Sequence, residues 1–216
     1  MINKTVVILC GGHGSRVKKY FPQTIKPLFL VEGIPIIERI IAMFKDYTIF
    51  INCNEEDAPK LEYLHLPLLI EKERIGNAGA LYYFRKQLGK KFIVIHCDEF
   101  TDLIPDRLWE AHEKNDGCMT MVIKNIRHKK EFGLVITQGD KIITCTKDRF
   151  VNTGIYCVDN RIFNYVDENK FQDLDNDIFP KLIENNYLAY YVHKGYWQDI
   201  GTEYWIRKIY GKKNKN

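Results

Sequence analysis

Three glycines and two cations follow an apolar run near the start of the chain, and their spacing suits the binding of a phosphate group. The run KTVVILC at residues 4–10 is followed by Gly11, Gly12, Gly14, Ser15, Arg16 and Lys26. Glycine lacks a Cβ atom, so successive backbone N–H groups can point into one concavity and bind phosphate oxygens. Arginine can bind two of these oxygens and lysine adds a point charge, which suits a reacting triphosphate. A solvated loop with incidental charges would use the same residue types, so composition does not separate the two interpretations.

The segment matches neither of the two common phosphate-binding loops. The dinucleotide-binding pattern G-x-G-x-x-G is incomplete, because Val17 stands where the third glycine is required. The P-loop is excluded because no Gly-Lys-Ser ending follows the glycines. What remains unusual is a pair of permanent cations, Arg16 and Lys26, on one connecting segment.

Strands and helices alternate over the first half of the chain and would position this segment. Apolar runs predict strands at residues 4–10, 47–53, 66–72, 91–100 and 118–126. Apolar residues at helical spacing predict helices at residues 34–45, 76–89 and 105–116. Right-handed crossover would make the first two strands parallel neighbours. We therefore expect an α/β fold, with a doubly wound, mixed, mostly parallel sheet flanked by helices that binds ligands at its carboxyl edge.

The second half of the chain is richer in strands. We expect a hairpin at residues 132–146, a helix at 176–186, and strands at 150–158 and 188–195. Residues 197–211 are predicted to run from a short loop into a last helix. We expect one domain over residues 1–216, with a nucleotide-binding half at 1–126 and an acceptor-binding half at 127–216.

Composition and charge narrow the functional class. The 216 residues are 45% hydrophobic and 28% charged, which is ordinary for a globular domain. The net charge of +4 is concentrated in the tail at residues 207–216, and no basic helix with interleaved aromatics accompanies it, so we expect no nucleic-acid partner. The chain has neither a signal-peptide pattern nor an apolar run of about 20 residues, so we expect a cytoplasmic protein without a membrane partner.

The six cysteines are widely spaced and predict buried packing rather than a metal or redox site. His13 lies within the glycine segment, but a phosphate nucleophile is already deprotonated near neutral pH and needs no general base. His96 and Cys97 are neighbours in a predicted strand and would point to opposite faces. We therefore expect these two side chains to serve in packing.

The glycine segment resembles the signature loop of the sugar-phosphate nucleotidylyltransferases, G-G-x-G-[ST]-R followed by P-K-P. The segments GGHGSR at 11–16 and IKP at 25–27 keep that family's ten-residue gap between arginine and lysine. Five further segments are similar to the family in the same order: GNAGAL at 76–81, HCDEF at 96–100, VNTGIY at 151–156, LDNDIFPKL at 174–182 and WQDIGTEY at 197–204. The short length and the ILCGG opening look most like the heptose-1-phosphate guanylyltransferases.

The resemblance implies a Rossmann-like nucleotidyltransferase fold and a transfer reaction. A phosphate oxygen of a sugar 1-phosphate would attack the α-phosphorus of a nucleoside triphosphate, and pyrophosphate would leave. The product would be an NDP-sugar, such as a GDP-heptose for capsule or lipopolysaccharide. The partners would be a nucleoside triphosphate and a phosphorylated small-molecule acceptor. The implied cofactor is Mg²⁺, held by Asp98 and Asp199, which the fold would have to bring together.

The resemblance also assigns roles to individual residues. The catalytic residues would be Arg16, Lys26 and Asp98. The nucleotide would be bound by Leu9, Gly11, Gly12, Gly14, Ser15, Arg16, Lys26, Gly76, Asn77 and Gly79. The acceptor would be bound by Lys147, Asn152, Gly154 and Asp175.

Three departures from the family pattern keep other functions open. Ile25 replaces a proline, Thr146 stands where the family usually has glutamate, and Asp175 replaces a glutamate. These changes affect the acceptor side or the rigidity of the loop. One alternative is a cytidylyltransferase acting on a non-sugar phosphate or phosphonate, and another is a regulatory nucleotide-binding module without turnover. A glycosyltransferase is a weaker alternative, because His96 occupies the place of its first metal-binding carboxylate. The base, the acceptor and the formation of a homo-oligomer stay open.

Overall fold

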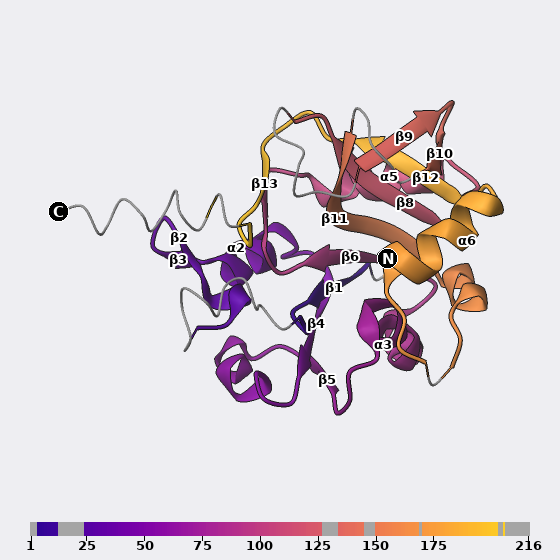
Figure 1. Cartoon of the computed structure of the whole chain (residues 1–216). Helices are drawn as coiled ribbons and strands as arrows, with labels where there is room; N and C mark the ends of the chain where they lie inside the picture. Colours follow the sequence, from indigo (N-terminus) through magenta and orange to yellow (C-terminus); the bar gives the residue numbers. More distant parts are fainter. Residues whose placement is uncertain are drawn as a thin grey trace.

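The computed structural model describes residues 4–12, 24–126, 134–144, 150–168, 170–202 and 205. Among these residues nine strands form one sheet, in the order β5-β4-β1-β6-β11-β8-β12-β10-β9. Figure 1 shows the sheet crossing the molecule from β5 at the bottom to β9 at the top. The strands are β1 (Thr5–Leu9), β4 (Thr48–Asn54), β5 (Leu68–Glu71), β6 (Lys91–His96), β8 (Met119–Lys124), β9 (Leu134–Gln138), β10 (Lys141–Thr144), β11 (Phe150–Asp159) and β12 (Leu188–Val192).

Two short pairs of strands lie beside the main sheet. They are β2 (Leu30–Val31) with β3 (Ile34–Pro35), and β7 (Glu99–Thr101) with β13 (Trp197–Asp199). The α-helices are α2 (Ile36–Met43), α3 (Gly76–Tyr83), α4 (Arg85–Leu88), α5 (Pro105–Glu113) and α6 (Phe179–Glu184). The shorter helical turns are η1 (Lys26–Leu28), η2 (Ala58–Lys60), η3 (Glu62–Leu64), η4 (Asn160–Tyr165) and η5 (Leu174–Ile178).

The sheet has the expected mixed, mostly parallel character. β1 pairs in parallel with β4 and β6, so the opening strand, helix and strand form the predicted crossover. β11 runs antiparallel to both β6 and β8, while β8 and β12 are parallel. Among the nine strands described, β10 and β11 alone run against the others. The sheet also joins both halves of the chain, because β11 lies between β6 and β8.

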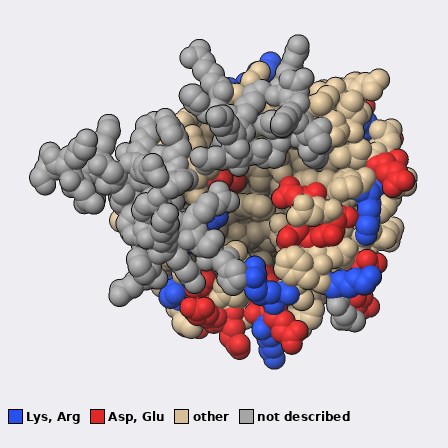
Figure 2. All heavy atoms as spheres, viewed as in Figure 1, with Lys and Arg blue, Asp and Glu red and all other residues tan. Residues whose placement is uncertain are grey.

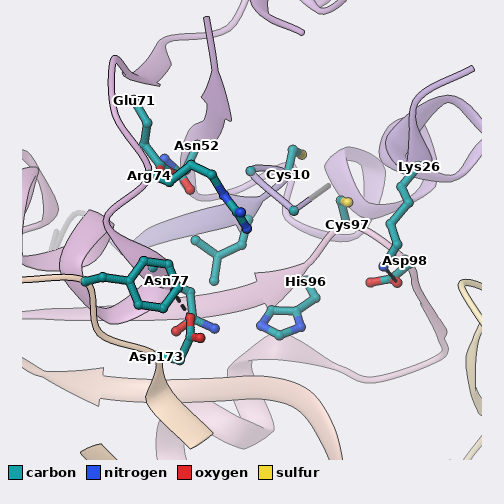
Figure 3. Close-up of a pocket in the computed structure, with 15 residues that line it drawn as sticks. Cys10, Lys26, Asn52, Glu71, Arg74, Asn77, His96, Cys97, Asp98 and Asp173 are labelled. Atoms are coloured by element: carbon teal, nitrogen blue, oxygen red, sulfur yellow. Dashed lines mark hydrogen bonds and ion pairs between the residues drawn. The ribbon is translucent and has the colours of Figure 1, made fainter. Parts of the chain in front are cut away.

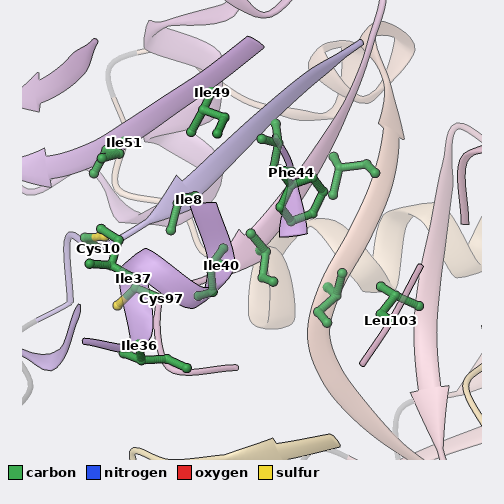
Figure 4. Packing of buried hydrophobic residues seen from close by; sticks show 14 of the residues in the cluster. Ile8, Cys10, Ile36, Ile37, Ile40, Phe44, Ile49, Ile51, Cys97 and Leu103 are labelled. Atoms are coloured by element: carbon green, nitrogen blue, oxygen red, sulfur yellow. The ribbon is translucent and has the colours of Figure 1, made fainter. Parts of the chain in front are cut away.

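Both faces of the sheet are buried, as continuous apolar strands require. Along β1, Val6 and Ile8 face one hydrophobic cluster, whereas Val7 and Leu9 face the other. Helices α2 and α5 contribute to the first cluster, and α3, α4 and α6 contribute to the second. Figure 4 shows the first cluster, where isoleucines of β1 and β4 lie close to α2. The helices therefore cover both faces, which is the doubly wound arrangement predicted from the sequence.

Three segments differ in detail from the sequence predictions. The helix expected at 76–89 is divided at Phe84 into α3 and α4. The helix expected at 176–186 begins with the wide turn η5, and Pro180 lies in the first turn of α6, where no backbone N–H is needed. Residues 197–199, predicted as a loop, form β13 because they pair with β7. No helix among the described residues is long and apolar enough to cross a membrane.

Phe44, at the end of α2, has a completely buried side chain in the first hydrophobic cluster, so truncating this side chain should destabilise the protein strongly. Phe44→Ala should lower the free energy of unfolding by about 3–5 kcal/mol, because apolar burial is lost and a cavity remains. Urea denaturation measures this change. Tyr83→Ala, at a side chain that is 64% exposed, is the matched control and should cost about 1 kcal/mol or less. Equal losses in the two variants would contradict the assignment of this core.

Candidate active site

A cavity opens at the carboxyl ends of β1, β4 and β6, the edge at which the sequence predicts ligand binding. Figure 2 shows that this face of the molecule is hollowed, with acidic and basic side chains around the hollow. Six of the predicted nucleotide-binding residues line the cavity: Leu9, Gly11, Gly12, Lys26, Gly76 and Asn77. Figure 3 shows side chains from both walls of this cavity.

Lys26 and two aspartates meet at one side of the cavity. The Nζ atom of Lys26 lies 2.5 Å from Oδ2 of Asp98, and this ion pair is largely buried. A Cβ atom built on Gly201 would overlap with the same Asp98 oxygen and would lie 3.1 Å from both Lys26 Nζ and Asp199 Oδ1. The ammonium group and both carboxylates therefore surround a single point. The structure thus brings together the two aspartates that the sequence predicts as metal ligands.

The pairing of β7 with β13 produces this meeting. Asp199 stands opposite Glu99 in the antiparallel register, one residue beyond Asp98. The N–H of Ile200 donates to the carbonyl of Asp98 at 2.9 Å, and the N–H of Gly201 donates to Asp199 Oδ1 at 2.7 Å. These hydrogen bonds therefore fix the Asp199 carboxylate and hold the backbone of Asp98 beside it. Gly201 has to be glycine because any side chain would enter the space that the carboxylates occupy.

Burial and neighbouring charges shift the pKa values of Lys26, Asp98 and Glu99. Burial by itself lowers the pKa of Lys26, but the Asp98 carboxylate outweighs it and the pKa is raised above its ordinary value. Burial raises the pKa of Asp98, but Lys26 and His96 hold it below its usual range. Burial together with Asp199 and Asp98 raises the pKa of Glu99 well above its ordinary value. Asp98 and Lys26 therefore stay ionised at neutral pH.

The residues present fit a divalent cation. Two carboxylates that reach one point supply the oxygen ligands that Mg²⁺ prefers. His96, Asp98 and Glu99 also each offer a ligand atom, and these three atoms lie within 4.8 Å of one another. His96, which the sequence assigned to packing, therefore lies at the edge of this group and lines the cavity. Its Nε2 atom is buried without a hydrogen-bond partner among the described residues.

The turn before α3 is locked to the segment that precedes η5. A Cβ atom on Gly76, where φ is +76°, would overlap with the carbonyl oxygen of Gln172. The side chain of Asn77 accepts a hydrogen bond from the N–H of Leu174 at 2.7 Å, while its own N–H donates to Asp173 at 3.3 Å. These contacts join residues far apart in the chain into one wall of the cavity (Figure 3).

Two residues that the sequence assigns to nucleotide binding, Leu9 and Gly79, already form backbone hydrogen bonds within the protein. The N–H of Gly79 donates to the carbonyl of Gln172 at 3.3 Å, and Gly79 packs against Ile75. The carbonyl of Leu9 accepts a hydrogen bond from the N–H of Cys97 at 3.1 Å. The structure therefore places Leu9 beside the cavity and Gly79 behind the turn that forms its wall.

The sequence reasoning missed three polar residues at the far end of the cavity, namely Asn52, Glu71 and Arg74. Glu71 Oε1 would lie 2.7 Å from a Cβ atom built on Gly11, so its carboxylate lies against the glycine turn. Figure 3 shows Arg74 reaching into the cavity between Glu71 and His96. A signal was present, because Asn52 and Glu71 are polar residues at the carboxyl ends of two predicted apolar strands.

The predicted acceptor residues form a second polar group. Asn152 Nδ2 donates to Asp175 Oδ1 at 3.2 Å and to the hydroxyl of Tyr156 at 2.8 Å. The N–H of Gly154 donates to Asn152 Oδ1 at 3.0 Å. A Cβ atom on Gly154 would lie 2.5 Å from Glu99 Oε1 and 3.2 Å from His96 Nδ1. His96 and Glu99 therefore connect the acceptor group to Asp98 and Asp199.

Some predicted residues lie outside the described part of the chain. They are Gly14, Ser15, Arg16 and Lys147, together with His13 and Cys145. The other five cysteines are buried and free, which confirms their predicted packing role.

Comparisons with known proteins show the family of this chain. The family described as Nucleotidyl transferase matches residues 5–209. The mannose-1-phosphate guanyltransferase of Debaryomyces hansenii is 26% identical over 90% of this chain and 60% of its own length. The chain spans between 51% and 60% of the length of the first curated relatives it matches.

Solved structures show the same fold. HddC from Yersinia pseudotuberculosis, solved with GMP-PN, has a TM-score of 0.82 at 22% identity, covering 97% of this chain and 99% of that one. The inositol-1-phosphate CTP transferase of T. maritima has a TM-score of 0.78 at 13% identity, covering 100% of this chain and 96% of that one. With the family match extending from β1 beyond Asp199, the chain belongs to the nucleotidyl transferase family.

Proposed function

We propose that this protein transfers a guanylyl group from GTP to a sugar 1-phosphate, releasing pyrophosphate and forming a GDP-sugar. The observation that carries the proposal is the meeting of Lys26, Asp98 and Asp199 at one point. Lys26 and Asp98 line the cavity that Gly11, Gly12 and Gly76 also line. Cations and glycine turns bind phosphates, whereas paired carboxylates bind a divalent cation. A heptose 1-phosphate is the acceptor that the sequence resemblance favours.

In the proposed reaction, a phosphate oxygen of the acceptor forms a bond to the α-phosphorus. The bond from that phosphorus to the pyrophosphate oxygen breaks on the opposite side. Lys26 would stabilise negative charge on the α-phosphate oxygens, and Arg16 would bind the pyrophosphate end. A divalent cation held by Asp98 and Asp199 would supply further charge neutralisation. The chain needs no general base, because the attacking phosphate is already ionised.

The far end of the cavity supports guanine as the base. Guanine presents two adjacent donors, N1–H and the N2 amino group, and a carboxylate can accept both. Glu71 offers such a carboxylate beside the glycine turn, opposite the wall formed by Gly76 and Asn77. The base edges of cytosine and adenine pair a donor with an acceptor, so a carboxylate fits them less well.

On the acceptor side, we propose that Asn152, Gly154 and Asp175 bind the sugar and that Lys147 binds its phosphate. The hydrogen bond between Asn152 and Asp175 supports the shared role of these two side chains. Residues 1–126 would then bind the nucleotide and residues 127–216 the acceptor, with Asp199 contributed across this division. Buried free thiols support a reducing, cytoplasmic location.

Pyrophosphate release tests the proposal directly. Each of GTP, CTP, UTP, ATP and dTTP is combined with mannose, glucose or heptose 1-phosphate, or with phosphocholine. We expect release only when a triphosphate and an acceptor are both present, and fastest with GTP and a sugar 1-phosphate. Release with CTP and phosphocholine would favour a cytidylyltransferase instead. Tight binding of a triphosphate without release from any pair would favour a regulatory module.

Glu71→Gln should weaken the preference for GTP. An amide presents one acceptor and one donor group, so one of the two guanine donors would lose its partner. We expect the ratio of kcat/KM for GTP over CTP to fall about tenfold or more, as loss of one buried hydrogen bond would cause. Glu73→Gln, two residues along the chain and exposed, is the matched control. An unchanged ratio in Glu71→Gln would show that the base is recognised elsewhere.

Gly201→Ala should reduce turnover while leaving the fold intact. The new methyl group would overlap with Asp98 Oδ2 and approach Lys26 and Asp199, so the carboxylates would separate. We expect kcat to fall roughly a hundredfold, the usual effect of losing one preorganised charge stabiliser. Pyrophosphate release and Tm are measured together.

Gly139→Ala serves as the control for this experiment. Gly139 lies between β9 and β10, and a Cβ atom there would have no heavy atom within 4 Å. Its φ of +58° means that the control costs some stability, but it should keep wild-type turnover. Wild-type turnover in Gly201→Ala would contradict the proposed role of the paired carboxylates.

A further inference from the structure

Lys26 is bound to Asp98, one of the two carboxylates that would bind a divalent cation. Its ammonium group lies 2.5 Å from Asp98 Oδ2. A Cβ atom built on Gly201 would lie 3.1 Å from this ammonium group and 3.1 Å from Asp199 Oδ1. Figure 3 shows the Lys26 side chain extended toward Asp98, at the end of the cavity away from Glu71 and Arg74. The side chain is only 23% exposed and that of Asp98 8%, so solvent screens this contact poorly.

The charges of Asp98 and Asp199 favour a cation close to both side chains. Asp98 and Asp199 would repel each other at this separation if no cation stood between them. Glu99 is already engaged, because its Oε2 atom accepts a hydrogen bond from Trp197 Nε1 at 2.6 Å. Lys26 neutralises the charge of Asp98 and lies close to the same point as Asp199.

A divalent cation and the Lys26 ammonium group would compete for Asp98. Both would contact the same Asp98 oxygen, and two like charges a few ångströms apart in a poorly solvated site repel strongly. The side chain of lysine has four rotatable methylene groups and can swing away. A phosphate group in the adjacent cavity would offer it a new partner.

We propose that Lys26 holds the place of the divalent cation in the nucleotide-free protein and moves to the nucleotide phosphates when the cation binds to Asp98 and Asp199. The inference rests on the proposed function and adds to it an order of events. Cation binding releases Lys26 from Asp98, and the released ammonium group then binds the phosphates of the triphosphate. Each ligand therefore strengthens the binding of the other. The nucleotide-free protein consequently binds the cation weakly.

Mn²⁺ binding to the nucleotide-free protein tests the inference without reference to activity. The free Mn²⁺ signal is followed by electron paramagnetic resonance during a titration of wild-type protein, Lys26→Met and Lys26→Arg. Removal of the competing ammonium should tighten Mn²⁺ binding by Lys26→Met about tenfold or more, since a like charge next to the ion is lost. Lys26→Arg keeps the charge and should bind Mn²⁺ as weakly as the wild type.

Two controls place the effect at the carboxylate pair. Lys60→Met removes another lysine that is paired with an aspartate, since Lys60 Nζ lies 3.2 Å from Asp57 Oδ1, and should leave Mn²⁺ affinity unchanged. Asp199→Asn combined with Lys26→Met should abolish the gain. Thermal unfolding provides a second measurement, because Mn²⁺ should raise the Tm of Lys26→Met more than that of the wild type.

The outcomes separate this inference from the proposed function. Equal or weaker Mn²⁺ binding by Lys26→Met would overturn the exchange, because Lys26 would then assist the cation or be irrelevant to it. If the wild type still releases pyrophosphate from GTP and a sugar 1-phosphate in that case, the proposed function stands. If Lys26→Met binds Mn²⁺ more tightly but the wild type releases pyrophosphate from no pair of substrates, the exchange is supported and the proposed reaction is refuted.

Discussion

The structure depends on bringing two aspartates and a lysine to one buried point at the edge of a sheet. Asp98 and Asp199 are held there by the pairing of β7 with β13, and Lys26 is held by the charge of Asp98. A buried carboxylate without a partner would be destabilising, so Lys26 stabilises this site as well as being a candidate catalytic group. Gly201 is required for the same reason, because a side chain there would separate the charges.

A second contact makes the cavity a single unit. Residues 172–174 bind the turn that begins α3, through the close approach of Gly76 to Gln172 and the hydrogen bonds of Asn77. The wall of the nucleotide cavity therefore contains residues from both halves of the chain. Asp175, one of the residues proposed to bind the acceptor, follows directly in η5 and is therefore next to this wall.

The residues that bridge these groups were the hardest to identify from sequence. The apolar pattern predicts a strand at residues 91–100, whereas the structure ends β6 at His96, and the position of His96 beside Cys97 in that strand suggested ordinary packing. Only the antiparallel position of β11 brings Gly154 next to His96 and Glu99. Glu71 was missed because the sequence does not reveal that β5 lies at the edge beyond β4, with its carboxyl end beside the glycine turn. β13 was missed because three residues carry too little periodicity to predict a strand.

The sequence by itself determined the alternation of strands and helices, the burial of both sheet faces, and the family signature from Gly11 to Asp199. These features are encoded locally, in the spacing of apolar residues and in short motifs. The tertiary structure alone decided which distant side chains share a site. Lys26, Asp98 and Asp199 meet because sheet order and the pairing of β7 with β13 bring their backbones together, and those pairings join residues about a hundred positions apart. Local propensity carries no information about contacts at such separations.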